Sequence, residues 1–149
     1  MDVLTPEQRH KNMSQIRSKD TKPEVWLRKK LFSEGYRYRK NSKAIPGHPD
    51  LWLKKYNTAV FVHGCFWHRH KNCKYASNPK TRVEFWTEKF QKNVERDNRV
   101  LEELKAANIK TLIVWECTIK QMKKDSDIAE KQLKDIERFF MSDELHKEV

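Results

Sequence analysis

The sequence predicts an α/β fold in which helices flank a central mixed sheet. Two short apolar runs, residues 58–63 and 110–116, have the composition of strands that are buried on both faces. Helical patterns lie before, between and after these runs, and such alternation is typical of layered α/β proteins. A chain of 149 residues without repeats or linkers fits one domain, residues 1–149.

Two helix starts lie near the beginning of the chain. Residues 5–8 combine a threonine cap, a proline and a glutamine, and they predict a short helix with basic residues on its face. Residues 21–24 repeat this capping pattern and open a run of helical spacing. The spacing predicts a helix with one buried face, carrying Leu27, Leu31 and Phe32 and ending at Gly35.

Strand and turn patterns come next. Aromatic and basic residues alternate over residues 36–39, which suggests a strand. Residues 45–49 are rich in turn formers and lead into the apolar residues 51–53, so we expect Asp50 at the entrance of a strand. The buried strand over residues 58–63 then leads directly into a group of cysteines and histidines.

Helices dominate the second half of the chain. Residues 81–84 form a third capping box, and apolar residues recur at helical spacing after it. We expect a long amphipathic helix over residues 82–107, in which Asp97 interrupts the apolar stripe. A final helix is predicted over residues 126–141.

The charge of the chain favours a nucleic-acid partner. The formal net charge is +11, and residues 1–40 carry eleven Lys/Arg against five Asp/Glu, whereas residues 121–149 carry six against eight. A basic ribosomal-type protein or a solubility effect would also explain this charge. The polar start of the chain, the absence of a long apolar run and the odd number of thiols predict a soluble, cytoplasmic protein. Without a heptad seam, we expect a monomer.

Residues 63–73 hold two of the three cysteines and three of the six histidines. Cys65, His70 and Cys73 can face one point, and Cys117, at the end of the later apolar run, can complete a tetrahedral zinc site. Because protein ligands fill all four positions, this zinc would be structural. The alternative is that Cys117 is a buried strand cysteine and that the other residues are incidental.

A second group of polar residues points to hydrolysis. Asp50, His63 and His68 lie at the ends of two neighbouring predicted strands. A carboxylate and a main-chain carbonyl are hard ligands for Mg²⁺, and an imidazole can take a proton from water, so the group suits phosphodiester hydrolysis. Taken singly, an aspartate at a strand start is more often a turn cap, and a lone histidine is more often solvated.

Six motifs between about residues 8 and 120 give the chain a specific resemblance to a known family. They are residues 11–13 (KNM), 46–50 (PGHPD), 62–68 (VHGCFWH), 81–86 (TRVEFW), 92–97 (KNVERD) and 113–117 (IVWEC). On these motifs the chain closely resembles the very-short-patch-repair mismatch endonucleases. The resemblance implies a restriction-endonuclease-like fold. It also implies nicking of one DNA strand beside a thymine mispaired with guanine, the lesion left by deamination of 5-methylcytosine.

The resemblance also implies roles for individual residues. Asp50 and the main-chain carbonyl of Val62 would ligate Mg²⁺, and His68 would be the general base. Glu24 and His63 would support the site by hydrogen bonds.

Aromatic and basic residues would contact the duplex. By the same resemblance, Phe66, Trp67 and Trp86 would wedge between base pairs, although the helical register of Trp86 also allows core packing. Residues 1–20 form the expected DNA-contacting segment. Its basic residues Arg9, Lys11, Arg17 and Lys19, together with Arg28, would hold phosphates.

Two other functions remain open on the sequence. The chain could be a non-catalytic, zinc-stabilised DNA-binding module that uses Asp50 and His68 structurally. It could also be a restriction-type nuclease that cleaves matched DNA.

Overall fold

The structure, a computed structural model, describes residues 20–149. Its strands are β1 (Arg39–Lys40), β2 (Leu51–Leu53), β3 (Thr58–His63), β4 (Lys110–Trp115) and β5 (His146–Glu148). They form one sheet in the order β1-β2-β3-β4-β5. The pairs β1–β2 and β2–β3 are antiparallel, whereas β3–β4 and β4–β5 are parallel. The mixed sheet predicted from the sequence is confirmed.

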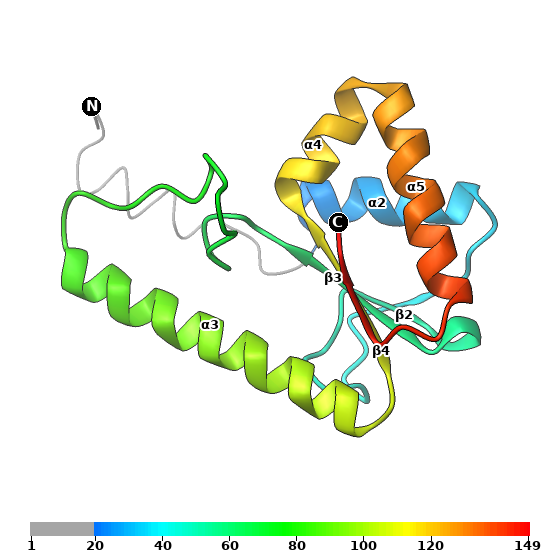
Figure 1. The fold of residues 1–149 in the computed structure, drawn as a ribbon, viewed down its shortest axis with the longest axis horizontal. Helices are drawn as coiled ribbons and strands as arrows, with labels where there is room; N and C mark the ends of the chain where they lie inside the picture. Colours follow the sequence, from blue (N-terminus) through cyan, green and yellow to red (C-terminus); the bar gives the residue numbers. More distant parts are fainter. Residues whose placement is uncertain (1–19) are drawn as a thin grey trace.

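Helices cover both sides of this sheet (Figure 1). Those in the described part of the chain are α2 (Lys22–Ser33), α3 (Val83–Ala106), α4 (Glu116–Lys124) and α5 (Ser126–Met141), with a 3-10 turn η1 (Lys54–Tyr56). α2, α4 and α5 lie together on one side, and the long α3 crosses the other side. This arrangement agrees with an α/β nuclease fold. No helix within residues 20–149 has the length and apolar character needed to cross a bilayer.

The main core lies between the sheet and the three helices α2, α4 and α5. Leu112 and Val114 of β4 point into it because alternate residues of a strand face the same side. Their partners include Leu27 and Leu31 of α2, Ile119 and Met122 of α4, and Leu133, Ile136 and Phe139 of α5. Full burial of each leucine or isoleucine stabilises the fold by about 1.5–3 kcal/mol. This core fixes the strands whose ends carry Asp50 and His63.

The helix α2 begins and ends as its sequence predicts. The Thr21 hydroxyl accepts a hydrogen bond from the Glu24 amide at 3.4 Å, and Gly35 adopts a left-handed φ of +97° just after the helix. Leu27 and Leu31 are buried, but Phe32 is 53 % exposed and therefore does not belong to the buried face. It packs instead against the edge of Tyr38, with the ring centroids 6.5 Å apart.

Two predicted elements differ in detail. The strand expected over residues 36–39 begins only at Arg39, because Tyr36 packs against Tyr56 and Phe140 instead of joining a strand ladder. α3 begins close to the expected position, but the capping box over residues 81–84 does not form. Its N-cap is Arg82, which has a left-handed φ of +52° and makes no side-chain capping hydrogen bond.

The sequence analysis missed α4 and β5. α4 follows β4 directly, and its N-cap, Trp115, makes no side-chain capping bond, so the sequence carries no start signal. As a result Cys117 lies in the first turn of a helix and not at the end of a strand. β5 has three polar residues, whose pattern shows no apolar alternation, and pairs with β4 near the end of the chain.

The turn before β2 packs closely against α3. Gly47 has a φ of +79°, and a Cβ atom added there would lie 2.4 Å from Cγ1 of Val100 and 3.2 Å from the Phe61 ring. The His48 amide closes the turn by donating to the Ile45 carbonyl at 3.0 Å. A residue without a side chain is therefore needed where this turn leads to Asp50.

We predict that Gly47→Ala destabilises the protein by roughly 2–3 kcal/mol, since it combines positive-φ strain with overpacking. Urea unfolding measures this change. Gly35→Ala is the matched control, because Gly35 has a positive φ but no neighbour within 4 Å of an added Cβ. It should cost about 1 kcal/mol. Equal losses for the two variants would contradict the close packing, and adding Val100→Ala should restore part of the loss in the first variant.

Candidate active site and metal centre

Asp50 is held by the neighbouring strand. It lies immediately before β2, and its Oδ2 accepts a hydrogen bond of 2.6 Å from the main-chain amide of Val62 on β3. Burial raises the pKa of Asp50 to about 7, whereas the Val62 hydrogen bond opposes this rise. Glu24 also raises this pKa by charge repulsion, which places both carboxyl groups in one neighbourhood. A dication beside Asp50 would favour its charged form.

Two histidine rings line the same cleft as this carboxyl group. His63 ends β3 and is buried, while His68 lies in the loop that follows. Their rings are stacked, with centroids 3.8 Å apart and planes at 6°. Burial lowers the pKa of His63 to about 3, and the neighbouring His68 adds to this effect, so His63 is neutral near pH 7.

His68 is oriented by an acidic residue of α3. Its Nδ1 lies 2.7 Å from Oδ2 of Asp97. An ionised carboxylate only accepts hydrogen bonds, so this contact places the imidazole proton on Nδ1 and leaves the Nε2 lone pair available. The sequence marks Asp97 as an interruption of an apolar stripe and as the last residue of motif 92–97, without assigning it a role. Its role beside His68 could not be derived from that signal.

The buried Glu24 pairs with the half-buried Arg28 on α2. Glu24 is 2 % exposed, and burial raises its pKa. The Arg28 guanidinium lies 3.4 Å from the Glu24 carboxylate and 2.7 Å from that of Asp20. Arg28 is therefore paired with two carboxylates of this chain, and its expected phosphate contact stays a prediction. Among the described residues the Glu24 side chain is linked to Arg28, and no direct hydrogen bond joins it to Asp50 or His63.

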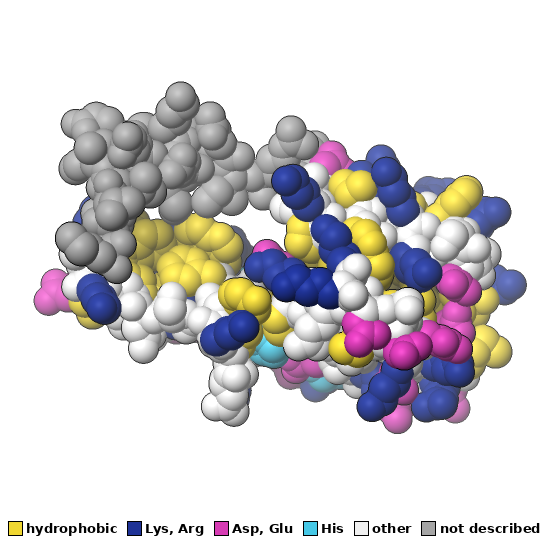
Figure 2. Space-filling view, turned by 90° about the horizontal axis from the view of Figure 1, so that it is seen from above, with side chains coloured by type: hydrophobic (Ala, Val, Ile, Leu, Met, Phe, Trp, Pro, Cys, Tyr) yellow, Lys and Arg dark blue, Asp and Glu magenta, His cyan; other side chains and the backbone are white. Residues whose placement is uncertain are grey.

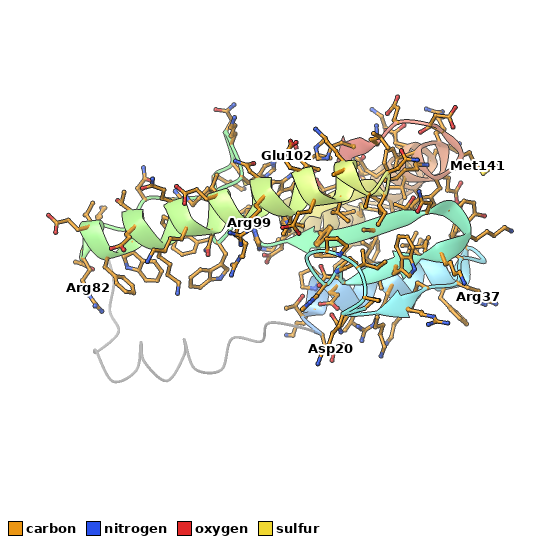
Figure 3. The ribbon with its side chains drawn as sticks, turned by 90° about the horizontal axis from the view of Figure 1, so that it is seen from below. Asp20, Arg37, Arg82, Arg99, Glu102 and Met141 are labelled. Atoms are coloured by element: carbon orange, nitrogen blue, oxygen red, sulfur yellow. The ribbon has the colours of Figure 1, made fainter. Side chains whose placement is uncertain are left out.

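One cleft brings these groups together. It has a volume of about 540 Å³ and lies between the end of β3, the turn before β2 and one side of α3. Asp50, Val62, His63, His68 and Asp97 all line it, as do the basic residues Arg96 and Arg99. Arg99 lies in the C-terminal half of α3 (Figure 3). The sequence assigns neither arginine to the site, although Arg96 lies in motif 92–97, because basic residues in a helical pattern resemble any solvated face.

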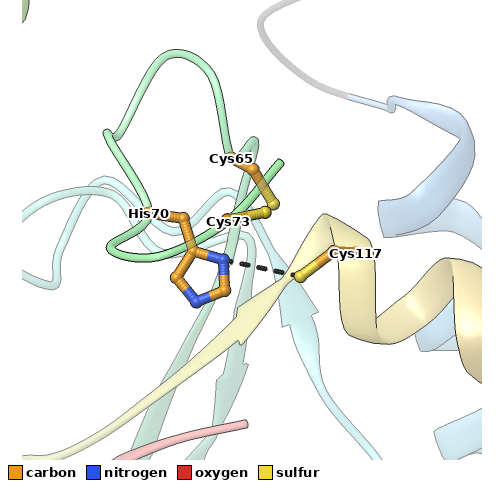
Figure 4. A group of neighbouring side chains, drawn as sticks. All are labelled: Cys65, His70, Cys73 and Cys117. Carbon is orange, nitrogen blue, oxygen red and sulfur yellow. Dashed lines mark hydrogen bonds between the residues drawn. The ribbon is translucent and has the colours of Figure 1, made fainter. Parts of the chain in front are cut away.

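The four predicted zinc ligands form one compact group, which we call the Cys/His cluster. Cys65, His70, Cys73 and Cys117 each offer a ligand atom, and these atoms lie within 4.8 Å of one another. The side chains point toward a common centre, and Sγ of Cys117 lies 3.4 Å from Nδ1 of His70 (Figure 4). The structure therefore brings together ligands that are separated by as many as 52 positions in the sequence.

The surroundings of the Cys/His cluster suit a metal ion. Burial raises the pKa of the Cys65 thiol to about 12, so a bound cation would be needed to hold it as a thiolate. The His70 ring stacks on Trp115 with centroids 4.1 Å apart, which fixes its orientation. Three sulfurs and one imidazole nitrogen are a donor set that zinc favours. The cluster can bind a metal ion that links the loop after β3 to α4.

The predicted wedge residues belong to a larger aromatic cluster. It consists of Phe66, Trp67, Phe85, Trp86 and Phe90, with successive ring centroids 5.1–5.8 Å apart. Phe66, Trp67 and Trp86 are partly exposed, so Trp86 is not a fully buried core residue. Figure 2 shows hydrophobic side chains gathered in a hollow at the end of the molecule where α3 begins.

The basic residues expected to hold phosphates in residues 1–19 lie outside the described part of the chain. They are Arg9, Lys11, Arg17 and Lys19, and the short helix expected after Thr5 also falls there.

Comparisons with known proteins give one consistent picture. The chain matches the family DNA mismatch endonuclease Vsr over residues 1–75. It is 49 % identical over 119 residues to the type II nicking enzyme V.NmeAIP of Neisseria meningitidis, covering 80 % of this chain and 84 % of that protein. It is 41 % identical over 128 residues to the DNA mismatch endonuclease Vsr of Escherichia coli, covering 86 % and 81 %. For the type II nicking enzyme V.XorIIP of Xanthomonas oryzae the identity is 40 % over 121 residues.

We predict that the protein purified without chelator carries about one zinc ion per chain, held by the four ligands of the Cys/His cluster. Elemental analysis by plasma mass spectrometry measures this content. Cys73→Ser should lower the zinc content and the melting temperature, whereas Lys71→Ala in the same loop should change neither. Wild-type protein with less than about half a zinc ion per chain would argue against the site.

Proposed function

Since the chain belongs to the DNA mismatch endonuclease Vsr family, we propose that this DNA endonuclease nicks one strand of duplex DNA beside the thymine of a T·G mismatch. Such a nick initiates very-short-patch repair of deaminated 5-methylcytosine. The observation that carries the proposal is the meeting of Asp50 and the His68–Asp97 pair in one cleft. Membership of an endonuclease family argues against the non-catalytic DNA-binding module.

Asp50 and Val62 would hold a magnesium ion in the proposed mechanism. The Val62 amide occupies Oδ2 of Asp50, so Oδ1 and the Val62 main-chain carbonyl remain as hard oxygen ligands. When bound, magnesium would stabilise the negative charge that develops on the scissile phosphate. Arg96 and Arg99 line the same cleft and add positive charge for the DNA backbone.

His68 would act as the general base. With Nδ1 bonded to Asp97, its Nε2 can take a proton from the attacking water, and the Asp97 carboxylate stabilises the imidazolium that results. His63 remains neutral because of its low pKa, so it places no second positive charge beside His68. Its stacked ring holds the His68 ring in place. Glu24 would contribute through its charge near Asp50.

The aromatic cluster would supply the preference for a mismatch. Phe66, Trp67 and Trp86 are exposed enough to stack between base pairs, and a mispaired step is separated at lower cost than a matched one. Arg9, Lys11, Arg17 and Lys19 would hold phosphates and position the duplex. We propose a monomer, since cleft and cluster come from one chain, and a cytoplasmic location, where the thiols of the zinc site stay reduced.

A second candidate is nicking or cleavage of matched DNA. It is favoured by the names of two relatives, V.NmeAIP and V.XorIIP, which are described as type II nicking enzymes. This restriction-type alternative uses the same catalytic residues. It differs only in the DNA that the protein prefers.

We predict that wild-type protein with Mg²⁺ nicks a labelled T·G duplex about tenfold or more faster than a matched T·A duplex. His68→Ala should lower the nicking rate by about 10²–10⁴-fold, because it removes the general base. Asp50→Asn should also be nearly inactive. The nicking rate of Asp97→Asn should lie between the rates of Asp50→Asn and wild type. Gel electrophoresis of single-turnover reactions measures all four.

Asp127→Asn, an exposed change on α5, is the control and should nick at the wild-type rate. Equal nicking of the two duplexes would support the restriction-type alternative. Full activity of His68→Ala or Asp50→Asn would remove the proposed catalytic roles.

A further inference from the structure

Arg69 connects the two ends of the loop between β3 and α3. Its Nη1 donates to the main-chain carbonyls of Phe66 at 3.2 Å and Ser77 at 3.1 Å. Its Nη2 donates to the Ala76 carbonyl and to Oδ1 of Asn78, each at 2.9 Å. Four acceptors spread over thirteen residues therefore share one guanidinium group.

The same guanidinium lies over aromatic rings. Its Cζ is 4.1 Å from the centroid of Phe90 on α3 and 5.5 Å from that of Phe66. Arg69 thus fastens the loop to α3 through a cation–π contact as well as through hydrogen bonds. A second bond to α3 comes from Asn93, whose side-chain amide donates to the Trp67 carbonyl at 3.2 Å.

An arginine beside a DNA-binding cleft would ordinarily be read as a phosphate contact. Each Nη atom carries two hydrogens, and these four hydrogen bonds engage all of them, so both Nη groups of Arg69 are directed at acceptors of this chain. Arg69 also separates His68 from His70, and its φ of +53° turns the chain between the catalytic base and the metal ligand. The hydrogen bonds of Arg69 are therefore made within the protein.

We propose that Arg69 is a positioning residue for mismatch recognition, which holds Phe66 and Trp67 against α3 before DNA binds. The proposal rests on the proposed function of the aromatic cluster as the mismatch wedge. A wedge that is already ordered in the free protein loses little conformational freedom when DNA binds. The contacts of Arg69 therefore strengthen binding to the duplex whose base step separates most easily. The residue contacts neither DNA nor the reacting atoms.

Arg69→Lys tests this proposal, because lysine keeps the positive charge but cannot span four acceptors. We expect the Kd for a T·G duplex, measured without divalent cations, to rise about tenfold, while the Kd for a T·A duplex stays unchanged. Zinc content should equal that of wild type. In the free protein, the amides of His70 and Ala76 should exchange with deuterium faster, because the loop around them is released.

Two further variants keep the test decisive. Asn78→Ala removes a single acceptor from an exposed position and should give a smaller change in the same direction, even if Arg69→Lys fails to fold. Arg82→Lys is the matched control, since Arg82 lies 4.5 Å from the Phe85 centroid at the same end of the molecule. It should keep the wild-type preference for T·G. An equal loss in Arg82→Lys would overturn the proposal.

Other outcomes would also overturn it. If Arg69→Lys and Asn78→Ala keep both the T·G affinity and the slow amide exchange of wild type, Arg69 does not hold the loop in place. If Arg69→Met weakens the binding of T·G and T·A duplexes equally and lowers the slope of log K against log salt by about one, Arg69 is a phosphate contact. If wild-type protein shows no T·G preference, the proposed function fails, but amide exchange still decides whether Arg69 holds the loop.

Discussion

The hydrogen bond from the Val62 amide to the Asp50 carboxylate is the contact on which the rest of the site depends. It joins the entrance of β2 to β3, and β3 is in turn fixed by parallel pairing with β4. A slip of one residue between β2 and β3 would turn every side chain of the slipped strand to the opposite face. Strand register thus decides whether a carboxyl group stands in the cleft, and the core behind the sheet maintains that register.

The helix α3 lines both the cleft that contains Asp50 and His68 and the aromatic cluster. Asp97 bonds to His68, and Phe90, seven residues earlier, belongs to the aromatic cluster. Seven residues make about two helical turns, so the two side chains share one face of α3 about 10 Å apart. The same helix therefore fixes the position of the aromatic cluster relative to His68.

Many elements of the fold can be predicted from short sequence patterns, whereas others depend on contacts between distant residues. The strands β3 and β4, the cap of α2 and the α5 boundaries follow from short-range patterns, and ligand chemistry was enough to group Cys65, His70, Cys73 and Cys117. The pairing of His68 with Asp97 joins positions 29 residues apart, so no periodic pattern reveals it. α4 lacks a capping residue, and β5 gains its order from pairing with β4, so both depend on tertiary contacts.

The magnesium site proposed at Asp50 can be located directly by anomalous X-ray diffraction from crystals of the protein soaked in Mn²⁺ as a substitute for Mg²⁺. We expect a Mn²⁺ peak at the Asp50 carboxylate and the Val62 carbonyl, in the cleft that His68 lines. That peak should disappear in crystals of Asp50→Asn, while the zinc peak at the Cys/His cluster should remain. A Mn²⁺ peak that persists in Asp50→Asn, or that lies away from Asp50 in wild type, would contradict the proposed magnesium site.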